Sequence, residues 1–327
     1  MNNYTTRALS LAVATTAVAG LVAGCNGGGS SSDSALDCST LTMVVPYSAG
    51  GSSDVVGRAL ADAVSASEGI RVEVVNQTGA NGTVAATQVA TKRPDPCEVI
   101  YLPNGPFASM PHFQDVQFEP ADFRGIYAVN EEPILLLVNA SSDWQSMDDL
   151  RADADRRFTY ASSGTGSYTQ ISVAQTFANL GADAEGIPFD GSAPAITALL
   201  GDQVDAVAVH PGEAMQYLES GDLRAIAVFS SDRLKTLPDV PTATEQDVDI
   251  ELAVFKSIYA NAEIPDEAAA ELERIFQAAG ESDEVTSTLE TLYSEPSSVP
   301  TDELVPTLEA EYEANATTFV ELGLIDG

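Results

Sequence analysis

Residues 45–54 read Val45-Pro46-Tyr47-Ser48-Ala49-Gly50-Gly51-Ser52-Ser53-Asp54, and this stretch decides the fold. Residues 41–45, on its amino-terminal side, form a short apolar run typical of a β-strand, and residues 54–66 carry apolar side chains at helical spacing. The chain therefore predicts a strand, a glycine- and serine-rich loop and a helix in succession. In an open α/β sheet such a loop lies at the carboxyl edge of the strands, where ligands bind.

A second unit of this kind follows more than 100 residues later. Residues 158–161 predict a strand, Ser162-Ser163-Gly164-Thr165-Gly166-Ser167 form the loop, and residues 169–180 predict a helix. Amides at a helix N-terminus attract anions, and glycine lets the backbone approach a ligand closely. Two half-sites on two lobes would close on a small anion. Either loop by itself is also consistent with an ordinary structural turn.

Five segments of the chain, in order and spacing, resemble the substrate-binding proteins of tripartite tricarboxylate transporters. The match covers roughly residues 40 to 325. The segments are Val45–Arg58, Asn76–Gly82, Tyr160–Ser167, Pro188–Ala195 and Leu237–Thr242.

This resemblance implies an α/β, two-lobed periplasmic-binding-protein fold of type II, in which each lobe is a doubly wound, mostly parallel sheet with flanking helices. It implies a receptor without a cofactor that captures a small carboxylate and delivers it to the permease of such a transporter, and we expect a monomer. The expected lobes are residues 37–133 with 252–327, and residues 134–251, with hinges near residues 129–139 and 249–255.

The resemblance also implies which residues bind the ligand. In the family the first and third loops bind carboxylates through backbone amides, hydroxyls and bridging waters. Asp54 is expected to cap the first helix and to pair with Arg58 rather than to touch the ligand. The expected binding residues are Tyr47, Ser48, Ala49, Gly50, Gly51, Ser52, Asn81, Ser163, Gly164, Thr165, Gly166, Ser167 and Ser192.

Two further candidates depart from the family pattern. Lys256 is one of three lysines and stands where the family usually has an apolar residue. It is expected either to meet a distal carboxylate or phosphate-like group of the ligand or to lie solvated beside the cleft. His210 follows the strand predicted at residues 205–209, so it either hydrogen-bonds the ligand or has a structural role.

The first residues predict export. Residues 8–22 are apolar or small, and this run is about as long as the apolar core of a secretory signal and too short for a spanning helix. Leu21-Val22-Ala23-Gly24-Cys25 resembles the lipobox of bacterial lipoproteins, so Cys25 is expected to carry lipid after removal of residues 1–24. Residues 25–36 are expected to be a flexible tether. The mature protein would be held on the periplasmic or cell-surface side of a membrane.

Lipidation of Cys25 leaves Cys38 and Cys97. An even pair in an oxidising compartment favours a disulfide. Each cysteine precedes a predicted strand, and the first and third strands of a doubly wound sheet are parallel neighbours, which places both at the same edge.

The composition is strongly acidic. The formal charge is −35, and removal of residues 1–24, which contain one Arg and no acid, makes it −36. Such a surface argues against nucleic acid or anionic lipid as partners. It resembles proteins adapted to high salt, although an ordinary acidic extracytoplasmic protein is the alternative.

The sequence fits other function classes less well. An enzyme is not expected, because neither His112 nor His210 lies in a nucleophile motif, and no metal-ligand spacing or phosphate-binding glycine motif occurs. A solute-sensing receptor that signals to a sensor kinase, and a binding protein of another transporter class, remain alternatives. The sequence leaves the identity of the carboxylate open.

Overall fold

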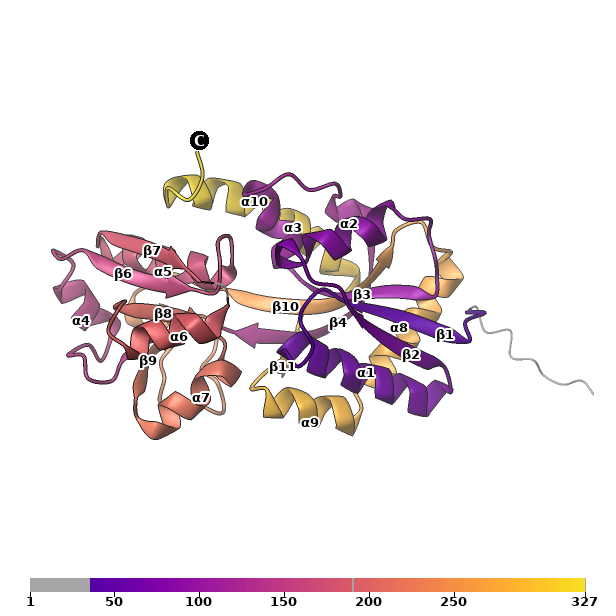
Figure 1. Cartoon of the computed structure of the whole chain (residues 1–327), viewed down its shortest axis with the longest axis horizontal. Helices are drawn as coiled ribbons and strands as arrows, with labels where there is room; N and C mark the ends of the chain where they lie inside the picture. Colours follow the sequence, from indigo (N-terminus) through magenta and orange to yellow (C-terminus); the bar gives the residue numbers. More distant parts are fainter. Residues whose placement is uncertain (1–35, 190, 327) are drawn as a thin grey trace, which may run out of the picture. The chain divides into compact units, whose positions relative to one another are not determined.

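The structure, a computed structural model, describes residues 36–189 and 191–326. Strands form two separate sheets, each flanked by helices (Figure 1). The first sheet has the order β11-β4-β10-β3-β1-β2 and the second β7-β6-β8-β5-β9. The strands are β1 Thr40–Val45, β2 Arg71–Asn76, β3 Glu98–Pro103, β4 Phe123–Pro133, β5 Leu135–Asn139, β6 Phe158–Ser162, β7 Ala184–Pro188, β8 Ala206–Val209, β9 Leu223–Val228, β10 Ala253–Asn261 and β11 Glu295–Pro296.

The helices follow the strands as the sequence predicts, with ends that differ by a few residues. Short 3-10 turns occur at Ala80–Gly82, Met110–His112, Pro120–Asp122, Thr244–Gln246 and Thr301–Glu303. The α-helices are α1 Ser52–Glu68, α2 Thr83–Thr91, α3 Gly105–Ala108, α4 Met147–Ala152, α5 Tyr168–Leu180, α6 Ser192–Leu200, α7 Pro211–Ser220, α8 Asp266–Gly280, α9 Asp283–Thr291 and α10 Leu304–Glu321. Within the described residues no helix combines the length and apolar character needed to cross a bilayer.

The two-lobed α/β fold is confirmed, but both sheets are mixed rather than mostly parallel. β1 runs parallel to β2 and β3, and β6 runs parallel to β7 and β8. β10 is antiparallel to β3 and β4, and β5 is antiparallel to β8 and β9. Both β5 and β10 begin where the chain arrives from the other sheet. They start at the edge of the sheet where their parallel neighbours end, so they run in the opposite direction.

Helices cover both faces of each sheet. Successive side chains of a strand point to opposite faces, so each face has its own hydrophobic core. In β3, Val99 and Tyr101 pack with α1 and α8, whereas Ile100 and Leu102 pack with α2 and α3. The second sheet behaves in the same way, with α4 and α5 on one face and α6 and α7 on the other. Side chains that alternate in this way bury both faces of the inner strands, such as β3, β5 and β8. The edge strands β2 and β7 consist of exposed and partly exposed residues.

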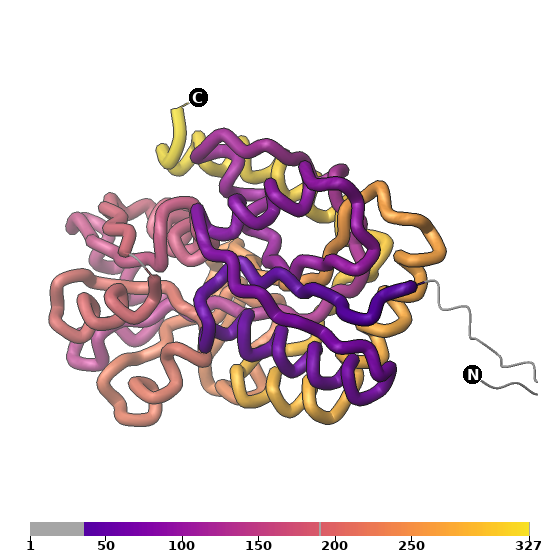
Figure 2. The backbone as a smooth tube through the Cα atoms, turned by 45° about the vertical axis from the view of Figure 1, so that its right-hand side comes forward, coloured from indigo at the N-terminus to yellow at the C-terminus, as the bar shows by residue number. Residues whose placement is uncertain are grey.

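The C-terminal helix α10 connects the two cores. Leu304 and Leu308 at its start pack with the first sheet, whereas Phe319 near its end packs with the second. Figure 2 shows this yellow helix beside the violet segment that contains α3, and Asn315 Nδ2 donates to the carbonyl of Ala108 at 2.8 Å. The strands divide between the sheets near Ile134 and before Ala253, while the residues assigned to each lobe stay a prediction.

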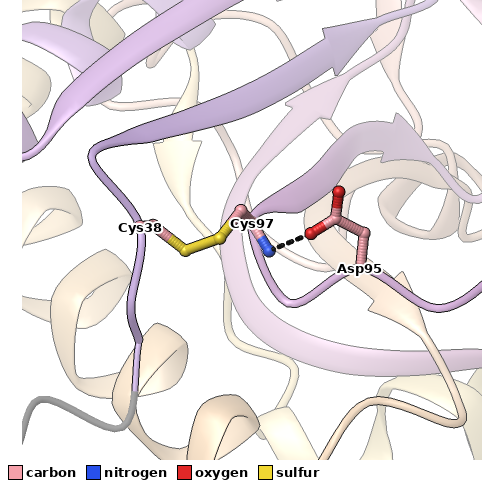
Figure 3. The surroundings of a disulfide bond; sticks show 3 residues. All are labelled: Cys38, Asp95 and Cys97. Carbon is pink, nitrogen blue, oxygen red and sulfur yellow. Dashed lines mark hydrogen bonds between the residues drawn. A yellow bond between two sulfur atoms is a disulfide. The ribbon is translucent and has the colours of Figure 1, made fainter.

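The predicted disulfide is present. Cys38 and Cys97 are bonded, and their Cα atoms are 5.7 Å apart (Figure 3). The parallel pairing of β1 and β3 brings both cysteines to the amino-terminal edge of the first sheet, as the sequence predicted. The amide of Cys97 also donates to Asp95 Oδ1 at 2.9 Å, which fixes the turn before β3. In the chain-entropy model, closing a loop of this size stabilises the fold by roughly 4 kcal/mol.

Candidate functional site

A cavity of about 460 Å³ lies where the carboxyl ends of the parallel strands meet the starts of the following helices. The strands β1, β6, β7 and β8 end at it, and α1, α5, α6 and α7 begin at it. The lining residues come from both sheets and their loops. They are Tyr47, Ser48, Gly51, Ser52, Ser53, Asn81, Pro103, Gly105, Pro106, Glu132, Ser163, Gly166, Ser167, Tyr168, Thr169, Gly191, Ser192, His210, Glu213, Val254 and Lys256.

The first loop is shaped by Asp54, which is 3% exposed. Asp54 Oδ2 accepts from the amide of Gly50 at 2.9 Å, and Asp54 Oδ1 accepts from Asn76 Nδ2 at 2.8 Å. Arg58 pairs with the same carboxylate at 2.9 Å. Burial by itself would raise the pKa of Asp54, but the bonds from Arg58, Gly50 and Asn76 outweigh it and lower the pKa to about 2. Asp54 therefore holds the loop as an anion without lining the cavity.

The loop after β6 is built by its own hydroxyls. Ser167 caps α5 by accepting from the amide of Gln170 at 3.2 Å. The hydroxyl of Thr169 accepts from the amide of Ser163 at 3.1 Å. Gly166 has φ +72°, and a Cβ there would lie 2.8 Å from the ring of Phe113, so the close approach and the left-handed backbone both require glycine.

Four helix N-termini surround the cavity, and this arrangement favours an anion. The first amides of a helix have no partner within it and point out of its start. Together with the helix dipole they attract negative charge, typically by about 0.3–1 kcal/mol for each helix. α1 and α5 present serine- and glycine-rich starts, and α6 begins at Ser192.

A buried ion pair lies at the base of the cavity. Lys256 Nζ donates to Glu132 Oε1 at 2.6 Å and to the hydroxyl of Ser52 at 2.9 Å. Both charged side chains are 6% exposed. Burial acts to raise the pKa of Glu132, but the positive charge of Lys256, the nearby His210 and the hydroxyl of Ser52 together lower it, so Glu132 is an anion.

This pair corrects one expectation for Lys256. The solvated lysine is wrong, because the residue is only 5% exposed. Lys256 does line the cavity, but its charge is already balanced by a carboxylate. An uncompensated ammonium would be costly to bury, so β4 and β10 supply the two partners together. The strand pairing explains this contact: Val254 on β10 pairs with Glu132 on β4, and Lys256 follows Val254 by two residues.

His210 follows β8 and directly precedes α7, and its ring contacts Pro133 at the end of β4. Its Nδ1 lies 3.0 Å from the carbonyl oxygen of Pro133, and its Nε2 lies 3.9 Å from Glu132 Oε2. A carbonyl oxygen only accepts, so Nδ1 carries the hydrogen. The His210 side chain thus comes from the loop after the second sheet, contacts a strand of the first sheet and lines the cavity.

The structure brings most of the sequence-predicted residues to one cavity. Those that line it are Tyr47, Ser48, Gly51, Ser52, Asn81, Ser163, Gly166, Ser167, Ser192, His210 and Lys256. Ala49, Gly50, Gly164 and Thr165 lie in the same loops but off the wall. Gly50 is turned toward Asp54, to which its amide donates, and Thr165 is exposed.

Sequence reasoning missed Glu132, Tyr168, Thr169 and Glu213 on the cavity wall. Tyr168 and Thr169 could have been found, because they are the first helical residues after a predicted binding loop. Glu132 had only a weak signal, an acid directly before Pro133 and a buried apolar run. Among the described residues no cluster of His, Cys, Asp and Glu could hold a metal ion.

A second set of contacts joins the lobes beside the cavity. The hydroxyl of Tyr168 donates to Glu311 Oε2 at 2.8 Å, and Asn104 Nδ2 donates to the same oxygen at 2.9 Å. Ser109 donates to the carbonyl of Gly166. Burial raises the pKa of Glu311. The start of α5 is therefore tied to α10 and to the segment around α3.

Comparison with known proteins identifies the family. Residues 56–311 match the model of the tripartite tricarboxylate transporter family receptor. The chain belongs to this receptor family. BugT of Bordetella pertussis is 32% identical over 213 residues, which is 63% of this chain and 65% of that protein. A protein of Agrobacterium vitis is 28% identical over 232 residues, 69% of this chain and 67% of its own length. The matched segments thus span about two thirds of these curated relatives.

Solved structures of similar proteins superpose over most of both chains. MatC of Rhodopseudomonas palustris with bound malate gives a TM-score of 0.72 at 26% identity, covering 85% of this chain and 98% of that one. Rpa4515 of R. palustris with adipate gives 0.76 at 27%, covering 87% and 97%. The family consists of solute receptors rather than enzymes.

Proposed function

We propose that this protein is an extracytoplasmic solute-binding lipoprotein that captures a small carboxylate between its lobes and delivers it to the permease of a tripartite tricarboxylate transporter. The observation that carries the proposal is the convergence of four helix N-termini on one polar cavity. Such a site attracts an anion without a free cationic side chain. Two relatives are solved with malate and adipate, both dicarboxylates, which supports the ligand class.

The proposed binding groups come from both lobes. From the first lobe they are the amides and hydroxyls of the loop at residues 47–52, with Asn81. From the second they are the loop at residues 163–167 and Ser192. Charge-assisted hydrogen bonds from amides to a carboxylate are stronger than neutral ones, and they strengthen further when water is excluded.

The proposed mechanism is closure of the lobes over the ligand. We take residues 37–133 with 252–327 as one lobe and 134–251 as the other. The chain passes between the sheets where β4 gives way to β5 at Ile134 and again before β10. Rotation at these crossings would bring the two sets of donors onto one ligand, in the manner of hinge closure in binding proteins.

The proposed location rests on residues outside the described part of the chain. Cys25 and the preceding signal sequence would place a lipid anchor on the exported protein, and residues 25–36 would act as a tether. Tethering raises the effective concentration of a receptor near its permease. Labelling with a palmitate analogue tests this: we expect label on the wild type and none on Cys25→Ser, and label that persists in Cys25→Ser would contradict the anchor.

The acidic surface is proposed as an adaptation to high salt. A formal charge of −35 makes the protein repel itself at low ionic strength, and salt screens this over about 10 Å at 0.1 M. A melting temperature that rises with added sodium chloride would support the proposal, whereas one that stays level would remove it.

A thermal-shift screen of purified protein against mono-, di- and tricarboxylates tests the proposed function. We expect at least one dicarboxylate to raise the melting temperature in a saturable way, because a ligand that binds only the folded state stabilises it. A set of neutral sugars is the control. If sugars stabilise the protein and no carboxylate does, the proposal fails. Recovery of a sensor kinase instead of a permease in a pull-down would favour the sensing alternative.

A further inference from the structure

The start of α5 brings two amide donors to the cavity. Ser167 accepts from the next two amides of the helix, through its hydroxyl from Gln170 at 3.2 Å and through its carbonyl from Ile171 at 3.0 Å. The amides of Tyr168 and Thr169 have no partner within the helix, because they come first in it. Both residues line the cavity. An anion in the cavity would therefore meet α5 at Tyr168 and Thr169.

The side chain of Tyr168 is anchored by residues that belong with the other sheet. Its hydroxyl donates to Glu311 Oε2 at 2.8 Å, and Asn104 Nδ2 donates to the same oxygen at 2.9 Å. Asn104 directly follows β3 and is fully buried. Glu311 lies on α10, one turn after Leu308, which packs in a core of the first sheet. Since α5 itself packs on the second sheet, the anchor crosses from one sheet to the other.

The loop before α5 is held from the same side. Ser109, between β3 and β4 in the chain, donates to the carbonyl of Gly166. A Cβ at Gly166 would lie 3.2 Å from the sulfur of Met110 as well as against the ring of Phe113. The loop thus packs closely on residues 109–113, and the start of α5 is positioned by parts of the chain outside its own sheet.

The hydroxyl of Tyr168 has no hydrogen left for a carboxylate. A phenol has one O–H donor, Glu311 accepts it, and a ligand carboxylate only accepts. The side chain of Tyr168 is 6% exposed, so it contributes its ring to the cavity wall while its hydroxyl faces α10. Glu311 is half-buried and does not line the cavity. Any effect of this hydrogen bond on a ligand must therefore act through the position of α5.

We propose that Glu311 is a positioning residue for ligand binding, which through the hydroxyl of Tyr168 holds the amides at the start of α5 where the anion binds. The inference rests on the proposed function, because it concerns the same anion site. Donors that are already fixed lose less freedom when the ligand binds, so the affinity is higher. Loss of the anchor weakens binding even while the protein stays folded.

Hydrogen–deuterium exchange of the ligand-free mature chain tests the anchor itself. Tyr168→Phe keeps the ring and removes the hydroxyl, and Glu311→Leu removes the acceptor. We expect the amides of residues 166–172 to exchange about tenfold faster in both variants, the effect of losing one hydrogen bond to a charged group. Tyr127→Phe and Glu313→Leu, matched changes away from the cavity, are the controls. Exchange at the wild-type rate in both variants overturns the inference.

Calorimetric titration with malate and with adipate measures the effect on binding. We expect Tyr168→Phe and Glu311→Leu each to weaken binding about fivefold, and the double variant to be no weaker, because both changes remove the same bond. Glu311→Gln keeps an oxygen that accepts from Tyr168, so its affinity should stay within about twofold of wild type. Tyr168→Phe, which keeps the buried ring, carries the test if Glu311→Leu does not fold.

The direction of the change in Glu311→Leu separates positioning from direct contact. If the hydroxyl of Tyr168 served the ligand, Glu311→Leu would free its hydrogen and tighten binding, which would overturn the inference. Losses that add in the double variant, or an affinity of Glu311→Gln as low as that of Glu311→Leu, would overturn it as well. If the wild type binds no carboxylate, the proposed function fails, and the exchange rates still decide whether Glu311 positions α5.

Discussion

At the scale of single residues, Asp54 holds the loop at residues 47–52 in place, although Asp54 itself does not line the cavity. Its carboxylate joins Gly50, Arg58 and Asn76, and its pKa is lowered to about 2. A group whose pKa is lower in the folded state adds stability above its unfolded pKa of 3.8, and this stability is lost as the pH falls toward 2.

Asp54→Asn is therefore expected to lower the free energy of unfolding by about 2 kcal/mol at neutral pH. The difference from wild type should disappear between about pH 4 and pH 2, because the wild-type carboxyl is then protonated. Urea unfolding at several pH values measures this. Asp62→Asn, at an exposed position of the same helix, is the control. A difference that is the same at all pH values would show that charge is not the cause.

Glu311 illustrates the opposite sign. Burial raises its pKa, so the folded protein holds this proton more tightly than the unfolded chain. Stability then falls as pH rises above the unfolded value of 4.5 through the folded one. Its neighbour Asn104 has a buried Oδ1 without a partner among the described residues.

We predict that Glu311→Gln stabilises the protein by about 1 kcal/mol at neutral pH, since it removes a partly buried charge and adds an amide that can donate to Asn104. Below about pH 4 the gain should be smaller. Thermal melts across pH, with Glu313→Gln on the exposed side of the same helix as the control, measure it. A lower melting temperature at neutral pH would show that the charge itself holds Tyr168.

At the scale of residues, the sequence could predict the loops, whose signal is local. It could not predict contacts that depend on how distant strands pair. The loops at residues 47–52 and 162–167 carry their own signal in glycine and serine. The Glu132–Lys256 pair does not, because its members are 124 residues apart and meet only through the pairing of β4 with β10. Lys256 was singled out as unusual, but its partner could not be named from the chain.

At the scale of elements, the proposed site is built from the starts of helices. α1 begins at Ser52, which lines the cavity and whose hydroxyl accepts from Lys256. Gly51 before it is extended, with ψ 165°, which is the conformation that a residue before proline prefers. Proline is tolerated at the first position of a helix, where it removes only the amide hydrogen.

Ser52→Pro should therefore weaken ligand binding by at least about tenfold without unfolding α1, because an amide donor to the anion is lost. Ser52→Ala keeps the amide and loses only the hydroxyl that accepts from Lys256, and it serves as the matched control. Calorimetry with the best ligand of the screen gives the comparison. Equal losses in the two variants would assign the effect to the hydroxyl instead of the amide.

Element order could be predicted from the sequence, but strand direction could not. The alternation of apolar runs and helices gave the α/β class, and the first and third strands are neighbours as expected. Mostly parallel sheets were expected, whereas β5 and β10 run antiparallel to their neighbours. The direction of a strand depends on the edge at which the chain enters the sheet after crossing from the other one. No local sequence pattern indicates this edge.

At the scale of the whole molecule, the strong negative charge opposes the capture of an anion. The protein carries 49 acidic residues against 14 Lys and Arg. Long-range repulsion slows the encounter of like charges, and salt screens it. We predict that the association rate constant for the ligand rises as sodium chloride increases from low to physiological concentration. Stopped-flow fluorescence measures the rate, and a rate that stays level or falls would show that local helix dipoles dominate the approach.

The most direct test of the carboxylate receptor is calorimetric titration of the mature protein with malate and adipate, the ligands bound in two similar solved structures. We predict saturable binding of one of them or of a close dicarboxylate at one molecule per chain, weakened at least about tenfold in Ser52→Pro but not in Ser52→Ala. Absence of heat with every dicarboxylate, or binding that is unchanged in Ser52→Pro, would contradict a carboxylate site at the helix N-termini.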